Sequence, residues 1–266
     1  MHGAIYKADP DPVYRKMRVM KESRENMNIL NVGNIIMNTY VYPCSGGYIM
    51  VDTGYAHSLK AVEAKLNKKG IKLSDIKYVF LTHAHDDHAG FLNELLGKNT
   101  ALKVIMSDRS MPTLKQGQNS FEGGCSTKLA WVFCKLMGLV GKAEHRFPAI
   151  DDKYNGRFVE ITETNKDALE KFLQGKILFT PGHTADSISL IADNVIFCGD
   201  AAMNGFPSIK RLIIWIGDIA DFEKSWDVLL SQNADAIYPA HGKPFSTADL
   251  AKYKKHISGL RLYKLN

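Results

Sequence analysis

The stretch LTHAHDDHAG, residues 81–90, places three histidines and two aspartates within six positions, directly after an apolar run. His83 and His85 are two residues apart, a spacing that puts both imidazoles on one side of an extended chain. Asp87 and His88 follow in a turn, where their side chains can point toward a second position nearby. Neutral imidazole and carboxylate are ligands of Zn²⁺ and related divalent ions. The stretch therefore predicts a metal site, with a solvated histidine-rich turn as the alternative.

Three further ligand-type residues each follow an apolar, strand-like run: His183 in PGHT, Asp200 in CGDA and His241 in PAHG. Loops at the ends of neighbouring strands converge at one edge of a sheet, so these residues are expected to lie together. With the first stretch they make seven candidate ligands, five histidines and two aspartates. The other histidines are interpreted as surface or helix residues; they are His2, His57, His145 and His256.

Strand-like and helical segments alternate in both halves of the chain, and two sheets packed face to face with helices outside would bury this pattern. We expect a single domain over residues 1–266, with an insertion at about 108–156. Gly70, Asp221 and Ser246 are the expected helix caps. Strands are predicted at 28–54 (as an antiparallel meander), 76–82, 101–107, 157–161, 176–180, 187–192, 195–198 and 234–242, and helices at 57–70, 90–97, 126–143, 220–232 and 246–260.

Composition narrows the class of protein. The chain has 266 residues, of which 45% are hydrophobic and 23% charged, with a net charge of +6. It has no long basic block, which disfavours nucleic-acid binding. The start has no apolar signal region, and the longest apolar stretch, 129–141, contains Lys135 and is too short to span a bilayer. The four cysteines form no C-x-x-C pair. We expect a cytoplasmic protein with reduced thiols that acts on a small molecule.

The order of the motifs resembles that of the metallo-β-lactamase superfamily. HAHDDH (83–88), PGHT (181–184), CGDA (198–201) and PAHG (239–242) follow one another, and VDTG (51–54) precedes them. The resemblance extends from about residue 30 to 245. It implies an α+β fold, a four-layer αββα sandwich, with a two-metal site between the upper edges of the sheets.

The resemblance also implies a role for each candidate ligand. Asp200 would bridge two ions, and Asp52 would orient the ligands by accepting a hydrogen bond; its alternative role is to cap the Thr-Gly turn. Asp87 would act as a proton shuttle as well as a ligand. The first metal would be held by His83, His85 and His183, and the second by Asp87, His88 and His241.

Single positions distinguish branches of the superfamily. The zinc β-lactamases typically have Cys where this chain has Asp200, and the oxygen-reducing diiron branch usually has Glu where it has His85. Lactonases often carry Tyr shortly after the bridging Asp, where this chain has AAM (201–203). These features imply a hydrolase with two divalent ions, zinc first, with manganese or iron as alternatives. A hydroxide between the ions would attack an ester, thioester or lactone-type bond. A phosphodiesterase or nuclease, and a non-catalytic metal-binding protein, remain the alternatives.

Two apolar segments, 126–143 and 201–218, have two interpretations. They could form the wall of a pocket for an acyl group, since the second segment directly follows Asp200. They could equally pack against the core or form the interface of a homodimer.

Overall fold

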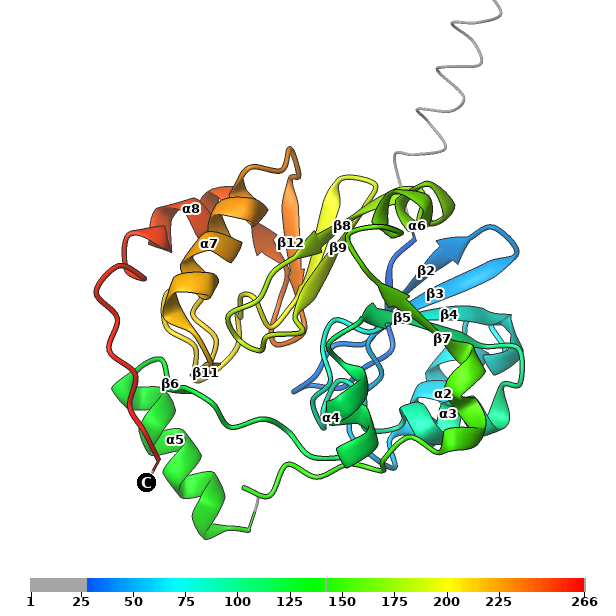
Figure 1. Cartoon of the computed structure of the whole chain (residues 1–266), viewed down its shortest axis with the longest axis horizontal. Helices are drawn as coiled ribbons and strands as arrows, with labels where there is room; N and C mark the ends of the chain where they lie inside the picture. The colour runs from blue at the N-terminus through cyan, green and yellow to red at the C-terminus, as the bar shows by residue number, and fades with distance from the viewer. Residues whose placement is uncertain (1–27, 142, 266) are drawn as a thin grey trace, which may run out of the picture.

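Two β-sheets pack face to face in the computed structural model, which describes residues 28–141 and 143–265 (Figure 1). His2 and the first 27 residues of the expected domain lie outside the described residues. The first sheet has the strand order β1-β2-β3-β4-β5-β7, and the second has the order β13-β12-β10-β9-β8. The first sheet comprises β1 (Leu30–Asn31), β2 (Tyr40–Cys44), β3 (Gly47–Val51), β4 (Ile76–Phe80), β5 (Lys103–Ser107) and β7 (Phe158–Ile161); the second comprises β8 (Gly175–Phe179), β9 (Ile188–Ala192), β10 (Val195–Gly199), β12 (Ala236–Pro239) and β13 (Phe245–Ser246).

Alternate residues of the strands fill the space between the sheets. Tyr40 and Tyr42 of β2 point inward, because side chains two apart in a strand share a face. The ring of Tyr42 stacks on Phe197 of β10, with centroids 5.4 Å apart. Phe80 of β4 and Leu190 of β9 belong to the same buried cluster. This aromatic layer holds the two sheets at a fixed spacing.

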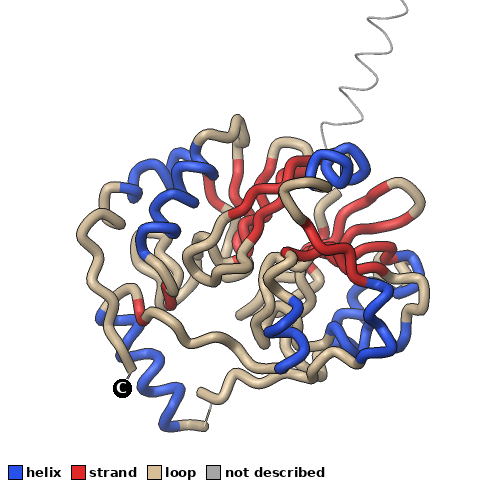
Figure 2. Tube along the Cα trace, viewed as in Figure 1, coloured by secondary structure: helices blue, strands red, loops and turns tan. Residues whose placement is uncertain are grey.

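Helices cover the outer face of each sheet and complete four layers (Figure 2). Leu59 of α2 (Leu59–Asn67) and Leu95 of α3 (Leu92–Lys98) pack in one cluster with Val79 of β4. On the second sheet, Trp226 of α7 (Ile219–Leu230) and Leu250 of α8 (Thr247–Lys254) are fully buried. The predicted α+β sandwich is therefore confirmed.

The helix caps differ in part from the expectation. Ser246 caps α8 as predicted, and its side chain accepts a hydrogen bond from the backbone of Asp249. Helix α7, however, begins two residues before Asp221, because Asp218 is the cap and accepts from Asp221 N at 2.8 Å. Helix α2 ends at Asn67, and Gly70 occupies a left-handed turn (φ +73°) beyond the cap instead of forming it.

The 108–156 segment contains the helix predicted within 126–143 and, beside it, elements that the sequence did not predict. It contains α4 (Met111–Gln116), the short strand β6 (Gly124–Cys125), α5 (Lys128–Leu139) and the start of a 3₁₀ turn (Asp152–Arg157). Strand β6 pairs with β11 (Trp215–Ile216), which ties the segment to the chain beyond Asp200. A further helix, α6 (Lys166–Leu173), and a 3₁₀ turn (Leu73–Asp75) were also not predicted. No helix within the described residues is long and apolar enough to cross a membrane.

Candidate metal centre

Five strands end at one edge of the sandwich: a predicted ligand follows four of them, and Asp52 follows the fifth. In the first sheet, β3 and β4 run parallel and end before Asp52 and the His83–His88 loop. In the second sheet, β10 and β12 run parallel and end before Asp200 and His241. Strand β8 is antiparallel to β9, which is antiparallel to β10, so it ends at the same edge, before His183. The topology therefore brings together residues that lie far apart in the sequence.

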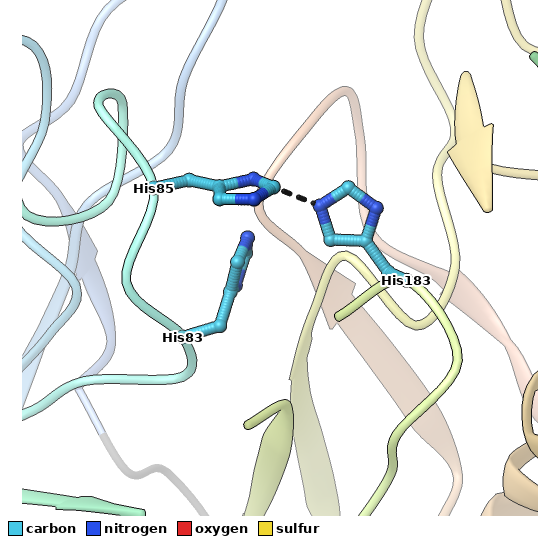
Figure 3. Close-up of side chains that lie close together, drawn as sticks. All are labelled: His83, His85 and His183. Atoms are coloured by element: carbon cyan, nitrogen blue, oxygen red, sulfur yellow. Dashed lines mark hydrogen bonds between the residues drawn. The ribbon is translucent and has the colours of Figure 1, made fainter. Parts of the chain in front are cut away.

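Three histidines converge at one end of this edge, and we call them the three-histidine group: His83, His85 and His183 (Figure 3). Nδ1 of His85 lies 3.1 Å from Nε2 of His183, and the ring centroids of His83 and His183 are 4.8 Å apart. Strand β4 ends at Phe80, so His83 and His85 lie in the loop after it, not in the strand. The two imidazoles lie on one side because of the path of this loop, and not because of the alternation of side chains along a strand, as was expected from their spacing.

Asp87, His88 and His241 form a second group, which we call the mixed group. Nε2 of His241 lies 3.2 Å from Oδ2 of Asp87, and Nε2 of His88 lies 3.7 Å from Asp87 Oδ1. Asp200 stands between the groups. Its Oδ2 is 3.4 Å from His183 Nε2, whereas its Oδ1 is 3.5 Å from His241 Nε2. One carboxylate therefore presents a different oxygen to each group, and all seven predicted ligands lie together.

Hydrogen bonds on the opposite side of each ring set the orientation of three histidines. His183 Nδ1 lies 2.7 Å from the carbonyl oxygen of Trp215, and His241 Nδ1 lies 2.8 Å from that of Ile36. A carbonyl oxygen only accepts hydrogen bonds, so Nδ1 carries the proton in both rings. In the neutral form of each ring, Nε2 then keeps its lone pair, directed into the site. Such an arrangement fixes the tautomer that a metal ligand requires.

Asp52 supplies the third of these contacts, as expected from the VDTG motif. Its Oδ2 accepts from Nδ1 of His88 at 2.9 Å. Thr82 donates to the same carboxylate twice, from its backbone nitrogen at 2.7 Å and its hydroxyl at 2.8 Å. Because the Thr82 proton is directed to Asp52, the hydroxyl oxygen is free to accept from His83 Nδ1, which lies 3.2 Å away. Asp52 and Thr82 thus orient ligand-type residues of both groups.

Several polar atoms that face the centre lack hydrogen-bond partners. Buried polar groups in folded proteins nearly always form hydrogen bonds, and exceptions need an explanation. Within the described residues, four of the six buried side-chain polar atoms without a hydrogen bond belong to the seven predicted ligands: Nε2 of His83, His85 and His88, and Oδ1 of Asp200. Divalent cations would satisfy these lone pairs. The donor set, imidazole nitrogen and carboxylate oxygen, fits zinc and related metals.

Charge divides the centre into two electrostatic environments. Burial and neighbouring imidazoles lower the pKa values of His83 and His85 well below the usual value, so both rings are neutral. Burial also opposes the charge on His241, but the carboxylates of Asp200 and Asp87 outweigh it and raise the pKa of His241 to about 9. Despite its burial, Asp200 has a pKa held well below the usual value by the surrounding imidazoles. The carboxylates therefore stay ionised and available as ligands.

Sequence reasoning missed Tyr55 and the function of Asp186. The hydroxyl of Tyr55 lies 3.5 Å from Asp87 Oδ2, and no motif marks this residue. Asp186 is buried and accepts from the backbone nitrogen of Ala84 at 3.0 Å and from the hydroxyl of Ser110 at 2.7 Å. Through these hydrogen bonds, Asp186 connects the loop of His183, which follows the second sheet, to the loop of His83–His88, which follows the first and is called the metal-motif loop.

The two apolar segments behave differently from each other. Most of 201–218 packs in the core of the second sheet, where Met203 and Ile213 are buried. Phe206 is exposed and Trp215 is half-buried, so only parts of this segment face solvent. Helix α5, which makes up most of the segment 126–143, is mainly unburied, and Ala130 is its one buried residue. The segment after Asp200 is therefore mainly core and not mainly a pocket wall.

Comparisons with known proteins agree with this geometry. The profile of the Metallo-beta-lactamase superfamily matches residues 35–241. The "Beta-lactamase-like protein 2 homolog" of Caenorhabditis elegans is 27% identical over 213 residues, which are 77% of this chain and 55% of that protein. The "Hydroxyacylglutathione hydrolase" of Alkalilimnicola ehrlichii is 28% identical over 159 residues, which are 59% of this chain and 42% of that protein. The chain thus spans about half the length of these curated relatives.

A solved structure shares the fold. A metallo-beta-lactamase family protein from Thermus thermophilus superposes with a TM-score of 0.62 at 19% identity, covering 87% of this chain and 79% of that one. This likeness concerns the fold alone, whereas the superfamily profile covers most of the sequence. The chain belongs to the metallo-β-lactamase superfamily.

Proposed function

We propose that the protein is a hydrolase that uses two divalent metal ions, zinc first among them, to cleave an ester, thioester or lactone-type bond of a small molecule. The observation that carries this proposal is the convergence of seven ligand-type residues on one buried edge, with several lone pairs left unpartnered. The superfamily includes relatives named as hydrolases, one of them for hydroxyacylglutathione.

Each residue of the centre has a proposed task. When bound, two ions would supply a water of lowered pKa as the nucleophile and would polarise the oxygen of the substrate. The three-histidine group would hold one ion and the mixed group the other. Asp200 would share its carboxylate between them, because its two oxygens face different groups. Asp52 would keep His88 in the tautomer whose Nε2 is free to bind.

Asp87 is proposed to move the proton to the leaving group. Its side chain is 14% exposed, against 6% for Asp200, so it is the carboxylate of the centre closer to solvent and to an entering substrate. Tyr55 donates toward Asp87 Oδ2 and would hold that carboxylate in place. Burial and the charge of Asp87 raise the pKa of Tyr55, so the hydroxyl keeps its proton and remains a donor.

The test is turnover of matched substrates by zinc-loaded protein, with chelator-treated protein as the control. The panel holds p-nitrophenyl acetate, an acyl thioester, a γ-lactone and bis-(p-nitrophenyl) phosphate. We expect the acyl substrates to be hydrolysed faster than the phosphodiester. Faster cleavage of the phosphodiester would make the protein a phosphodiesterase instead. Bound zinc without turnover of any substrate would assign it a binding role.

A further inference from the structure

Three aromatic rings that no motif marks form a row beside the metal centre; we call it the aromatic row, and it consists of Phe121, His145 and Trp215. Phe121 meets the imidazole of His145 edge to face at 5.8 Å between centroids, and the indole of Trp215 at 6.4 Å. The row is open to solvent, since Phe121 is 51% exposed and the His145 side chain 43% exposed. Phe121 and His145 belong to the 108–156 segment, and Trp215 begins β11.

Both ends of the aromatic row are bonded to loops that carry predicted ligands. The carbonyl of Trp215 accepts from His183 Nδ1 at 2.7 Å, and its indole is fixed by donating to the carbonyl of Glu122 at 2.6 Å. At the other end, His145 Nδ1 lies 3.2 Å from Oδ1 of Asp86, the residue between His85 and Asp87. The row therefore connects the loop that carries His85 to the loop that carries His183, and it lies next to the three-histidine group.

His145 is held in place by more than this one bond. Its carbonyl accepts from Asn119 N at 3.2 Å. Asn119 and Asp86 exchange two hydrogen bonds, from Asp86 N at 2.8 Å and from Asn119 Nδ2 at 2.7 Å. The backbone of His145 has φ +46°, a left-handed conformation that costs energy for a residue with a side chain. Such strain persists only where the surroundings enforce it, and it concentrates at functional sites.

The second ring nitrogen of His145 is available to a ligand. The carboxylate of Asp86 only accepts, so Nδ1 carries a proton and donates to it. Among the described residues, none forms a hydrogen bond with His145 Nε2. The hydrogen bond to Asp86 raises the pKa of His145, which favours the imidazolium form with a proton on Nε2 as well. An exposed, oriented donor with partial positive charge thus stands beside two apolar rings.

We propose that the aromatic row selects acyl substrates that carry a carboxylate: His145 Nε2 donates to that carboxylate, and Phe121 and Trp215 contact the apolar part of the acyl group. The proposal rests on the acyl-hydrolase function above and names its substrate class. Uncharged acyl groups lack the carboxylate that His145 would bind. His145 acts in this account as a specificity residue and takes no part in bond cleavage.

The test compares two esters of equal chain length on zinc-loaded protein: p-nitrophenyl pentanoate and mono-p-nitrophenyl glutarate, which carries a terminal carboxylate. Wild type should prefer the glutarate ester. His145→Gln should lower kcat/KM for the glutarate ester about ten- to a hundredfold, mainly through KM, because a charge-assisted hydrogen bond is lost. It should change the pentanoate ester less than about twofold, since uniform apolar contacts remain. Phe121→Ala should weaken both esters by similar factors.

His256→Gln is the matched control, because His256 is another surface histidine and lies at the end of α8. It should leave both substrates unchanged. An equal loss on both esters in His145→Gln would show a structural role and overturn the proposal, and so would no loss on either.

Binding of uncleavable amides separates this inference from the proposed reaction. Calorimetry with the anilide of glutaric acid and with pentananilide should show tighter binding of the first, abolished by His145→Gln. If neither ester is hydrolysed but this preference is found, the acyl-hydrolase function fails and the carboxylate site stands. Equal binding of the two anilides by wild type would remove the site, whatever the turnover.

Discussion

The metal centre and the neighbouring 108–156 segment differ in how the chain holds them. His83 and His88 have no exposed surface, and hydrogen bonds orient both rings from behind. In contrast, Leu136 and Leu139 of α5 are 53% and 83% exposed, and their helix buries one residue. The centre lies on strand ends of two packed sheets. The segment, in contrast, packs only a few residues into the core, such as Leu114, Phe147 and Ile150, and its exposed part joins the body through a short strand pair and a few side-chain bonds.

From this difference in burial we infer different tasks for the two regions: the metal centre serves the reaction, and the exposed segment serves substrate selectivity. Ligands that hold two metal ions must be fixed in position. The sheet edges fix their backbone, and residues that hydrogen-bond the ligands from behind, such as Asp52, fix their side chains. The exposed part of the segment, which makes few buried contacts, can change its surface without disturbing those neighbours. Substitutions in the centre should therefore act on metal binding and turnover together, and substitutions in the exposed part of the segment should act on substrate choice or on nothing measurable.

The largest effect is expected at Asp200. Asp200→Asn removes the negative charge that faces both groups. Metal affinity and kcat/KM should therefore fall further than the roughly 10–100-fold that is typical when a residue that hydrogen-bonds a metal ligand is replaced. Asp193→Asn is the control, since Asp193 is an exposed aspartate in the turn between β9 and β10. Circular dichroism should show both variants folded. Normal turnover in Asp200→Asn would mean that the ligand assignment is wrong.

A smaller effect is expected at Asp52. Asn keeps the shape and tolerates the left-handed backbone of this position (φ +56°), which Asp193 shares. Asn, however, accepts at one position only: if its oxygen replaces Oδ2 and accepts from His88 and the Thr82 hydroxyl, its NH₂ group faces the backbone N–H of Thr82, which donates to Oδ1 of Asp52. Zinc affinity, measured by competition with a chromophoric chelator, should drop about 10–100-fold. An affinity equal to that of Asp193→Asn would show that Asp52 serves the turn only.

The smallest effect on turnover is expected on the outer face of α5. Replacing Leu136 and Leu139 by Gln should change kcat/KM less than about twofold, because both side chains point to solvent. If this exposed face forms a homodimer, which is the alternative interpretation of segment 126–143, light scattering should show a shift from dimer to monomer in the same variant. A marked fall in kcat/KM would place α5 in the substrate site and weaken the contrast between the two regions.

The position of the seven candidate ligands at one sheet edge can be predicted from the sequence because each of them lies in the loop that follows a strand. In CGDA and PAHG, the apolar run, the small residue and the ligand are contiguous, so local pattern and sheet topology lead to the same edge. The helix that begins at Ile219 shows the limit of such reasoning. Asp218 and Asp221 are both good caps, and only the backbone conformation, extended at Asp218, decides between them.

Contacts between distant residues leave no such local mark. His145 meets Asp86 across 59 positions, and Tyr55 meets Asp87 across 32. Neither residue lies in a periodic or spaced pattern, so the interpretation of His145 as an ordinary surface residue missed its bond to the metal-motif loop. Similarly, the apolar content of 126–143 and 201–218 could not show which segment is buried, because both have the composition of a core.

The most direct test of the two-metal account is the zinc content of single-group variants. Stripped protein is reloaded with zinc, freed of excess metal and measured by elemental analysis per chain. The account predicts about two ions in wild type, and about one in His183→Gln and in His241→Gln, since each removes a ligand of a different group. A value near zero in reloaded wild type would contradict the account, as would two ions in both variants.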